Sequence, residues 1–351
     1  MNWLRRLLRR RGYHLTRISG GELAELDAYE RRLAENAAPV PFNQALSRLV
    51  ELKKRYEAVT LPIANHSLWS SRAASRPNPR AGWSQGGIEV FRGGGRNSYV
   101  GPYGATDPLR ARLLFFIFAN SVRQRDGAGL LGRLREDGAF GCPTFEFPGL
   151  GRVSRDLLDS ILEINFLERH AGILRRPGLR VLDIGAGYGR LAHRMLEAKP
   201  DIASYACVDA VADSTFLCEL YLRHRGLLDR VDVVPMDELH RALRPDSFDL
   251  ALNIHSFSEC TFAAVEWWLQ RLGEMRVPLL MIVPNQPDQF LAVEPDGRHR
   301  DYREILARTG YSEVAREPVF DDPAVRELLV KDTMHLFRLS GASSASSAPV
   351  R

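Results

Sequence analysis

The sequence predicts an α/β fold built on a doubly wound parallel sheet, and three observations predict it. Apolar runs of strand length alternate with segments of helix length over the C-terminal half of the 351-residue chain. The first run, Val181–Ile184, leads into three glycines and then into a helical segment. Acidic residues follow the second and third runs directly. Alternation of this kind is typical of a parallel sheet with helices on both of its faces.

The elements follow one another in a regular order in this region. We expect strands at 181–184, 205–209, 231–237, 248–254, 279–284, 314–320 and 334–339, and helices at 191–197, 215–225, 262–274 and near 302–306. The first five strand segments are largely apolar, as in strands that are buried on both faces. A further helix, with an N-cap at Ser154 and apolar residues at helical spacing, is expected to precede the sheet.

The N-terminal third is expected to be mainly helical. Residues 41–59 predict an amphipathic helix that serves as a spacer or an oligomer contact. A cap and a first-turn proline at 106–108 predict another helix, whose apolar run 113–118 should be deeply buried. We therefore divide the chain into a basic helical extension (1–60), a cap region over the substrate site (61–152), the sheet domain (153–340) and a disordered tail (341–351).

Four aromatic residues of the cap region stand among Gly, Ser and Arg residues. They are Trp69, Trp83, Tyr99 and Tyr103. Aromatic rings can stack on sugar rings, but the interpretation that we favour is that they fill a small core.

Basic residues are concentrated at the N-terminus. The first 20 residues contain six arginines and no acid, so the net charge of +5 comes from this end. Trp3, Leu4, Leu7 and Leu8 share one helical face, a pattern suited to an anionic membrane surface. We expect a cytoplasmic protein with a peripheral contact to the inner face of the membrane through residues 1–17. The alternatives are a transit peptide and a plain basic tail, and the confinement of the charge argues against a nucleic-acid partner.

The turn after the first strand has the spacing of a nucleotide-binding turn. Glycines at 185, 187 and 189 give the backbone conformations closed to other residues and let a ligand approach closely. A dinucleotide-binding turn would have its third glycine where this chain has Arg190, and no Gly-Lys-Ser/Thr follows as in a phosphate-binding loop. The alternative is an ordinary tight connection between a strand and a helix.

The spacing Asp-x-Gly-x-Gly-x-Gly resembles the first motif of class I S-adenosylmethionine-dependent methyltransferases. The resemblance implies a Rossmann-like seven-stranded sheet whose last strand is antiparallel, with S-adenosylmethionine as the cofactor. It also implies that the turn packs against the cofactor's ribose and amino-acid moiety. The residues to which it assigns cofactor contacts are Asp183, Gly185, Ala186, Gly187, Tyr188 and Gly189.

Acidic residues at the ends of the next two strands are further candidates. Asp209 stands about 20 residues after the glycines, where an acid can accept hydrogen bonds from both ribose hydroxyls; alternatively, it caps the helix near Ser214. Asp237 could face the adenine amino group, or it could be a solvated loop acid. Ala210 and Asn253 are also expected to contact the cofactor, because ligands lie beyond the carboxyl ends of such strands.

Candidates for acid–base chemistry lie just past the fourth strand. His255 is the side chain best suited to act as a general base near neutral pH; the alternative is a structural hydrogen bond at the strand end. Glu259 is expected to orient His255 or to contact the substrate. Its alternative role is that of an acid in the first turn of the next helix, where the helix dipole favours negative charge.

A narrower resemblance rests on Ser154–Ser160, on Ser256, Phe257 and Glu259, and on Asn285 at the end of the fifth strand. These segments look like the putative sugar O-methyltransferase family, and the similarity covers about Gly138 to Leu339. Cys260 departs from it, because a methionine is expected there. The resemblance implies methylation of a hydroxyl of a sugar or glycosylated metabolite, with Ser256 and Asn285 near the substrate. The alternatives are a methyltransferase for non-sugar natural products and a non-catalytic cofactor-binding or scaffolding module.

Neither a metal nor a disulfide is required by the sequence. His255, Glu259, Asn285 and Asp288 could converge on a hard divalent cation, but no spacing demands it. The four cysteines contain no Cys-x-x-Cys and are expected to be buried thiols in a reducing compartment.

Overall fold

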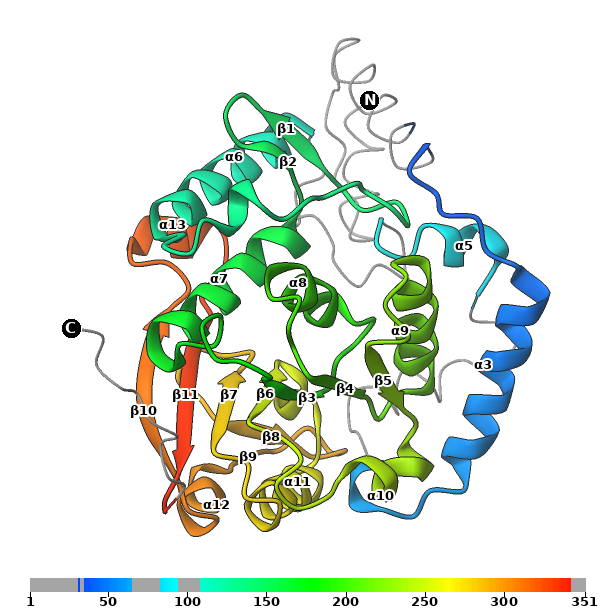
Figure 1. The fold of residues 1–351 in the computed structure, drawn as a ribbon, viewed down its shortest axis with the longest axis vertical. Helices are drawn as coiled ribbons and strands as arrows, with labels where there is room; N and C mark the ends of the chain where they lie inside the picture. Colours follow the sequence, from blue (N-terminus) through cyan, green and yellow to red (C-terminus); the bar gives the residue numbers. More distant parts are fainter. Residues whose placement is uncertain (1–30, 32–34, 65–82, 94–107, 342–351) are drawn as a thin grey trace, which may run out of the picture.

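The core of the protein is a seven-stranded mixed sheet (Figure 1). The computed structural model describes residues 31, 35–64, 83–93 and 108–341. The strands are β3 (Arg180–Ile184), β4 (Ser204–Val208), β5 (Val231–Val234), β6 (Leu250–Ile254), β7 (Leu279–Val283), β10 (Tyr311–Pro318) and β11 (Thr333–Leu339). Their order is β10-β11-β7-β6-β3-β4-β5, and β11 is antiparallel to both of its neighbours. The predicted fold class and the antiparallel last strand are confirmed.

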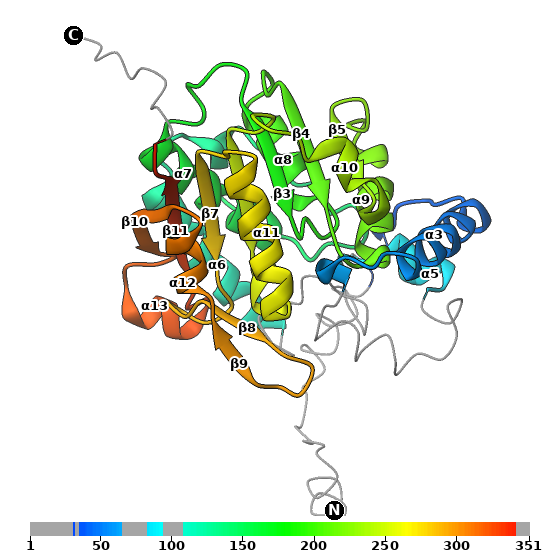
Figure 2. The same cartoon turned by 90° about the horizontal axis from the view of Figure 1, so that it is seen from below.

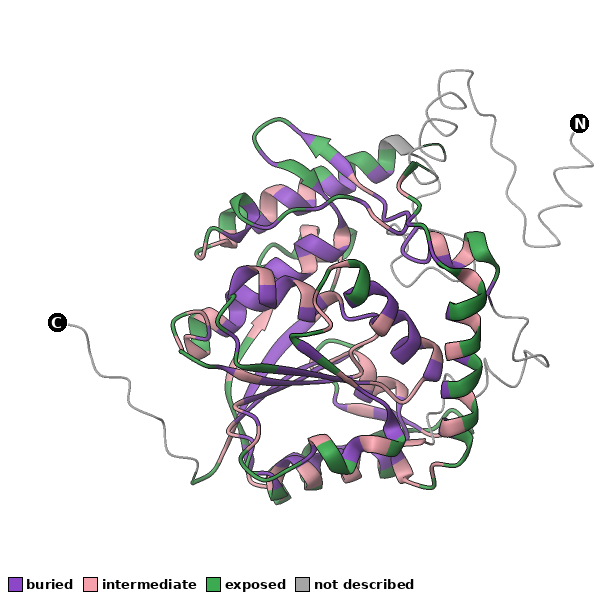
Figure 3. Cartoon of the chain, turned by 45° about the vertical axis from the view of Figure 1, so that its right-hand side comes forward, coloured by how far each residue is buried: buried purple, intermediate pink, exposed green. Residues whose placement is uncertain are grey.

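Helices cover both faces of this sheet (Figure 1). One face carries α7 (Arg155–Ala171), α8 (Arg190–Ala198) and α9 (Ala212–His224), and the other carries α10 (Leu239–Ala242), α11 (Phe262–Glu274) and α12 (Arg303–Arg308). Every residue of β7 is buried, which explains why its sequence is apolar without alternation. Figure 3 shows the buried strands between the two helical layers.

The helix ends follow the expected capping chemistry. Ser154 accepts a hydrogen bond from the backbone N–H of Leu157 at the start of α7, as predicted, and Thr261 caps α11 in the same way. Gly172, at φ 62°, ends α7 in the left-handed conformation that a glycine adopts without strain.

The described part of the N-terminal third packs against the sheet domain. It contains α3 (Phe42–Glu57), η1 (Pro62–Ala64), α5 (Gln85–Glu89), α6 (Pro108–Arg125), η2 (Leu130–Gly132) and the hairpin β1 (Phe145–Phe147)–β2 (Gly151–Val153). Figures 1 and 2 both place α3 beside α9. Leu49, Leu52 and Tyr56 are buried, so one face of this predicted amphipathic helix packs within the chain.

The apolar run of α6 is only partly buried, which corrects a second expectation. Leu114, Phe115 and Phe118 are buried, whereas Leu113 and Phe116 are 57% and 45% exposed. The reason is geometric: α6 packs on α7 and lies on the surface, so residues at helical spacing alternate between the two environments.

Several short elements differ from the expectation. β5 ends at Val234 and is followed by η3 (Met236–Glu238), and the hairpin β8 (Leu291–Val293)–β9 (His299–Asp301) and α13 (Pro323–Leu328) were not predicted. Segments this short carry no recognisable periodicity. The expected membrane contact at 1–17, Trp69, Tyr99, Tyr103 and the tail from 342 lie outside the described residues.

The remaining findings on the fold concern the membrane, the thiols and Trp83. No helix in the described part of the chain has the length and apolarity needed to cross a bilayer. All four cysteines are free and buried, as predicted. Trp83 is buried and donates a hydrogen bond to Asp213 at 2.9 Å, so this aromatic belongs to the core.

Candidate cofactor and acceptor site

The Gly-rich turn lies at the carboxyl edge of the sheet, between β3 and α8. Gly185, Gly187 and Gly189 have φ values of 76°, 57° and 82°, a region that favours glycine. A Cβ on Gly185 would lie 2.2 Å from Cβ of Ser256, and one on Gly189 would lie 3.0 Å from Sγ of Cys218. The turn therefore needs glycine for its backbone conformation and for its close neighbours.

Asp209 connects this turn to the end of β4. Its two carboxylate oxygens accept hydrogen bonds from the backbone N–H groups of Gly187 at 3.0 Å and Val211 at 2.8 Å. Burial raises the pKa of Asp209 to about 7, and the two N–H groups only partly oppose this. Each oxygen keeps acceptor capacity for a further donor. Asp209 is thus the acid that adjoins the turn, as its sequence position predicts.

Asp183 lies within the sheet layer. Its carboxylate accepts a hydrogen bond from the hydroxyl of Tyr205 on β4 at 2.9 Å. Burial raises the pKa of Asp183 to about 7, against the opposing effect of that hydrogen bond. Asp183 therefore links β3 to β4 immediately before the turn.

The side chains of Tyr188 and Asn253 form hydrogen bonds with groups next to the glycine turn. Tyr188 is buried, and its hydroxyl donates to Asp156 of α7. The amide of Asn253 donates to the carbonyl of Ile184 and accepts from the N–H of Phe257, both at 2.9 Å. Both side chains thus bind groups of the protein beside the turn, and the cofactor contacts expected of Tyr188 and Asn253 stay predictions.

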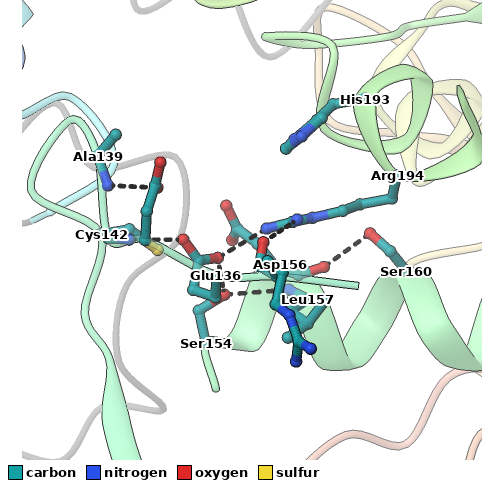
Figure 4. Close-up of polar contacts among 12 residues, drawn as sticks. Glu136, Ala139, Cys142, Ser154, Asp156, Leu157, Ser160, His193 and Arg194 are labelled. Atoms are coloured by element: carbon teal, nitrogen blue, oxygen red, sulfur yellow. Dashed lines mark hydrogen bonds and ion pairs between the residues drawn. The ribbon is translucent and has the colours of Figure 1, made fainter. Parts of the chain in front are cut away.

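A buried ionic network adjoins Tyr188 through Asp156, and Figure 4 shows Asp156 with Glu136 and Arg194. Glu136 accepts hydrogen bonds from Arg92 at 3.0 Å and from Arg194 at 2.9 Å, and Arg92 also donates to Asp156 at 2.9 Å. Burial alone would raise the pKa of Glu136, but the two guanidinium groups hold it well below its usual range. Because the four side chains are almost fully buried, the network fixes the start of α7 relative to α8.

Asp237 lies in η3, just past β5. Arg55 of α3 donates to both of its carboxylate oxygens, at 2.8 and 2.9 Å, and also to Glu238. The structure thus places Asp237 at the predicted edge, but it adds a partner from a helix 182 residues earlier in the chain.

His255 follows β6 and pairs with Asp332, which precedes β11. The distance from Nε2 of His255 to Oδ2 of Asp332 is 2.9 Å. Burial lowers the pKa of His255, but the hydrogen bond to Asp332 more than offsets this, so the pKa is raised. Both residues line a cavity of about 30 Å³, which also touches Asp159, Glu163 and Arg190.

The short helix that follows His255 carries Glu259, the second candidate for acid–base chemistry. His255 has a φ of 66°, and the chain turns there into the short helix η4 (Ser256–Glu259). After burial and two backbone hydrogen bonds, the charge of Glu259 is a further influence, which raises the pKa of Asp209. Asp332 is a partner of His255 that the sequence did not predict, and the role of Glu259 stays a prediction.

Ser256 is the first residue of η4, and Asn285 is bonded to the same helix. Ser256 packs against Gly185, while the backbone N–H of Asn285 donates to Oγ of Ser258 at 3.1 Å and its side chain is exposed. Across the described ranges, no group of three or more His, Cys, Asp or Glu residues is arranged to hold a metal ion.

A second hollow, of about 710 Å³, lies at the opposite, amino edge of the sheet. Its charged lining consists of Arg176, Arg180, Arg276, Arg308, Asp246 and Asp249. The four guanidinium groups are paired with carboxylates, and none of the predicted site residues lines this hollow. The candidate site is therefore the carboxyl edge, where the glycines, the acids and His255 meet.

The strand order and the single antiparallel strand are those of the Rossmann-like class I methyltransferase fold. No family model matches the sequence, and no curated protein matches it. Similar solved structures include the [4+2]-cyclase SpnF, with 15% identity over 66% of this chain and 95% of that chain at a TM-score of 0.38. They also include the mitomycin 7-O-methyltransferase MmcR, with 18% identity over 66% of this chain and 68% of that chain at a TM-score of 0.36.

A third similar structure is the N,N-8-amino-8-demethyl-D-riboflavin dimethyltransferase RosA from Streptomyces davawensis. It has 22% identity over 53% of this chain and 58% of that chain, at a TM-score of 0.36. The assignment of the fold rests on the strand order and directions given above.

Proposed function

We propose that this protein is an S-adenosylmethionine-dependent O-methyltransferase that acts on a hydroxyl of a sugar or glycosylated metabolite. The observation that carries the proposal is the glycine turn bonded to Asp209, together with the His255–Asp332 pair. This pair lies at the end of β6, which is adjacent to β3 in the sheet. The turn supports a ligand that approaches the backbone closely, and the pair supports removal of a proton.

The residues at the carboxyl edge fit this cofactor. Gly185, Ala186 and Gly187 offer a backbone surface without bulky side chains, and Asp209 has acceptor capacity for the ribose hydroxyls. Ala210 and Asp237 extend the same edge toward the adenine. When bound, S-adenosylmethionine supplies an electrophilic methyl group on a sulfonium.

His255 is the proposed general base, and its hydrogen bond to Asp332 supports Nδ1 as the atom that acts. Nε2 is bonded to Asp332, while Nδ1 has no partner among the described residues. A neutral imidazole that donates from Nε2–H carries its lone pair on Nδ1. Nδ1 would take the proton of the acceptor's hydroxyl, so that the oxygen could attack the methyl group that the cofactor would supply. Alignment of the acceptor lowers the barrier further.

The choice of acceptor rests on the sequence resemblance to the putative sugar O-methyltransferases. Ser256 beside Gly185 and the exposed Asn285 lie at the same edge as His255, which supports their proposed place near the acceptor. A non-sugar natural product is the second candidate acceptor, because the described residues contain no feature specific for a sugar. The non-catalytic alternative predicts cofactor binding without turnover.

Calorimetric titration with S-adenosylmethionine, S-adenosylhomocysteine and NAD, on the wild type and on Asp209→Ala, tests the cofactor. We expect the two sulfur ligands to bind the wild type and to bind the variant at least about ten-fold more weakly. Binding of NAD instead, or no binding at all, would overturn the proposal. Methyl transfer to a panel of sugar and non-sugar hydroxyl compounds then separates the candidate acceptors, and cofactor binding without any transfer would support the non-catalytic module.

A further inference from the structure

In the last turn of α3, the guanidinium group of Arg55 binds the carboxylate of Asp237, which lies at the carboxyl edge of the sheet. Nε and Nη2 of Arg55 donate to Oδ2 and Oδ1 of Asp237, at 2.8 and 2.9 Å. The two side chains are 24% and 34% exposed, so the pair is only partly covered. A bidentate pair of this kind fixes the plane of the carboxylate as well as its position.

Other contacts fix α3 independently of Arg55. Seven residues earlier, Arg48 donates to both oxygens of Glu219 on α9, at 2.9 and 2.6 Å. The hydroxyl of Tyr56 lies 2.7 Å from Oγ1 of Thr215 and donates to the backbone carbonyl of Asp209 at 3.2 Å. The helix is thus anchored to α9 and to the end of β4, and it presents Arg55 to Asp237 in a fixed position.

We propose that Arg55 is a positioning residue for the cofactor's base: it orients Asp237 so that this carboxylate accepts a hydrogen bond from the exocyclic amine of adenine. This inference rests on the proposed function. Each oxygen of Asp237 uses one acceptor site for Arg55 and retains another. A carboxylate accepts from an amine but repels a carbonyl oxygen, so the oriented Asp237 distinguishes adenine from hypoxanthine.

The inference extends the cofactor site to the N-terminal third of the chain. If the carboxylate of Asp237 rotated freely, it would lose conformational entropy on binding the amine. The bidentate contact with Arg55 already fixes it, so this loss is avoided. Loss of Arg55 should therefore reduce the affinity for a ligand with adenine more than the affinity for a ligand that lacks the exocyclic amine. A purely structural contact would affect both ligands equally.

The test measures the binding of S-adenosylhomocysteine and S-inosylhomocysteine by calorimetry, together with the melting temperature of each variant. The variants are Arg55→Met, Arg55→Lys and the matched control Arg48→Met, which removes a similar bidentate pair from the same helix. We expect Arg55→Met to weaken the binding of S-adenosylhomocysteine about ten-fold and that of S-inosylhomocysteine much less. The preference for adenine over hypoxanthine should therefore fall. Arg48→Met should preserve the preference, and Arg55→Lys should lie between.

A double variant with Asp237→Asn provides the second arm. If Arg55 acts through Asp237, adding Arg55→Met to Asp237→Asn should cause little further loss of S-adenosylhomocysteine binding. Equal weakening of both ligands by Arg55→Met, or the same result from Arg48→Met, would overturn the inference while leaving the proposed function intact. If neither ligand binds the wild type, the proposed function itself fails, and this inference fails with it.

Discussion

The hydroxyl of Tyr188 donates a hydrogen bond to Oδ2 of Asp156, and this contact joins the glycine turn to the first turn of α7. Asp156 also accepts from Arg92, so the turn is connected through one carboxylate to the buried network of Arg92, Glu136 and Arg194. Its other oxygen, Oδ1, is buried and has no hydrogen-bond partner among the residues that the structure describes. The conformation of the turn is therefore supported by groups that lie outside the carboxyl edge of the sheet.

Substituting Tyr188→Phe tests this support. The loss of a hydrogen bond to a buried, charged acceptor should lower the free energy of unfolding by about 1–3 kcal/mol. The affinity for S-adenosylhomocysteine should change little, because the side chain points into the core. Denaturant unfolding and calorimetry measure the two effects. Weaker binding with an unchanged unfolding curve would show instead that the ring contacts the cofactor.

The variant Glu136→Gln tests the network itself. It leaves Arg92 and Arg194 buried beside a neutral amide, and breaking one partner of a buried ionic cluster typically costs about 3–5 kcal/mol. We expect a large fall in the denaturant midpoint. The matched control is Asp246→Asn, which breaks the exposed pair with Arg276 and should leave the midpoint unchanged. Similar curves for the two variants would contradict the assignment of a stabilising network.

Cofactor affinity should depend on pH through Asp209. Burial raises the pKa of this carboxyl to about 7, so much of it is protonated in slightly acid solution. The ionised form is the stronger acceptor for ribose hydroxyls, so affinity for S-adenosylhomocysteine should rise from about pH 6 to about pH 8, with release of protons on binding. Calorimetry in buffers of different ionisation enthalpy measures this release. Asp209→Asn should remove the dependence; a slope that survives in this variant would assign it to another group, such as Asp183.

Turnover should depend on pH through His255. Burial lowers its pKa, and Asp332 more than offsets this, aided by Glu163 and Asp159 of α7; Arg190 lines the same cavity. The base must be neutral, so kcat/KM should rise with pH through this raised pKa. Asp332→Asn should move the inflection to lower pH and reduce the limiting rate, and His255→Ala should cost about 10²–10⁴-fold. Full activity of a His255→Ala variant that still binds cofactor would contradict the proposed base.

The same raised pKa has a consequence for stability. A histidine whose pKa is higher in the folded state stabilises that state fully below its unfolded pKa of about 6.5, and the contribution is lost as the pH rises through the folded value. The difference in unfolding free energy between the wild type and Asp332→Asn should therefore be larger in slightly acid solution than in alkaline solution.

The sequence predicted the parts of the site that depend on local pattern. The glycine spacing, Asp209 and His255 are set by residues within or just after single strands, and all three lie at the expected edge. The partners were not predictable, because they come from far along the chain. Asp332 is 77 residues from His255, Arg55 is 182 residues from Asp237, and Arg92 is 64 residues from Asp156. Only the folded sheet brings these pairs together.

The local conformation after His255 was not predictable either. Four residues after His255 is the spacing at which side chains share a face of an α-helix. Here the intervening residues form the 3₁₀ helix η4, entered through a left-handed His255. A one-dimensional pattern cannot distinguish these two kinds of helix.

The direction of β11 decides where the chain leaves the sheet. Because this strand runs opposite to its neighbours, it begins at Thr333 beside His255 and ends at Leu339 on the amino edge, next to the hollow lined by Arg180 and Arg276. The polypeptide thus departs from the sheet on the side away from the glycine turn. An affinity tag or surface anchor joined directly after Gly341 should therefore begin at the amino edge and leave the approach to the glycine turn and His255 open.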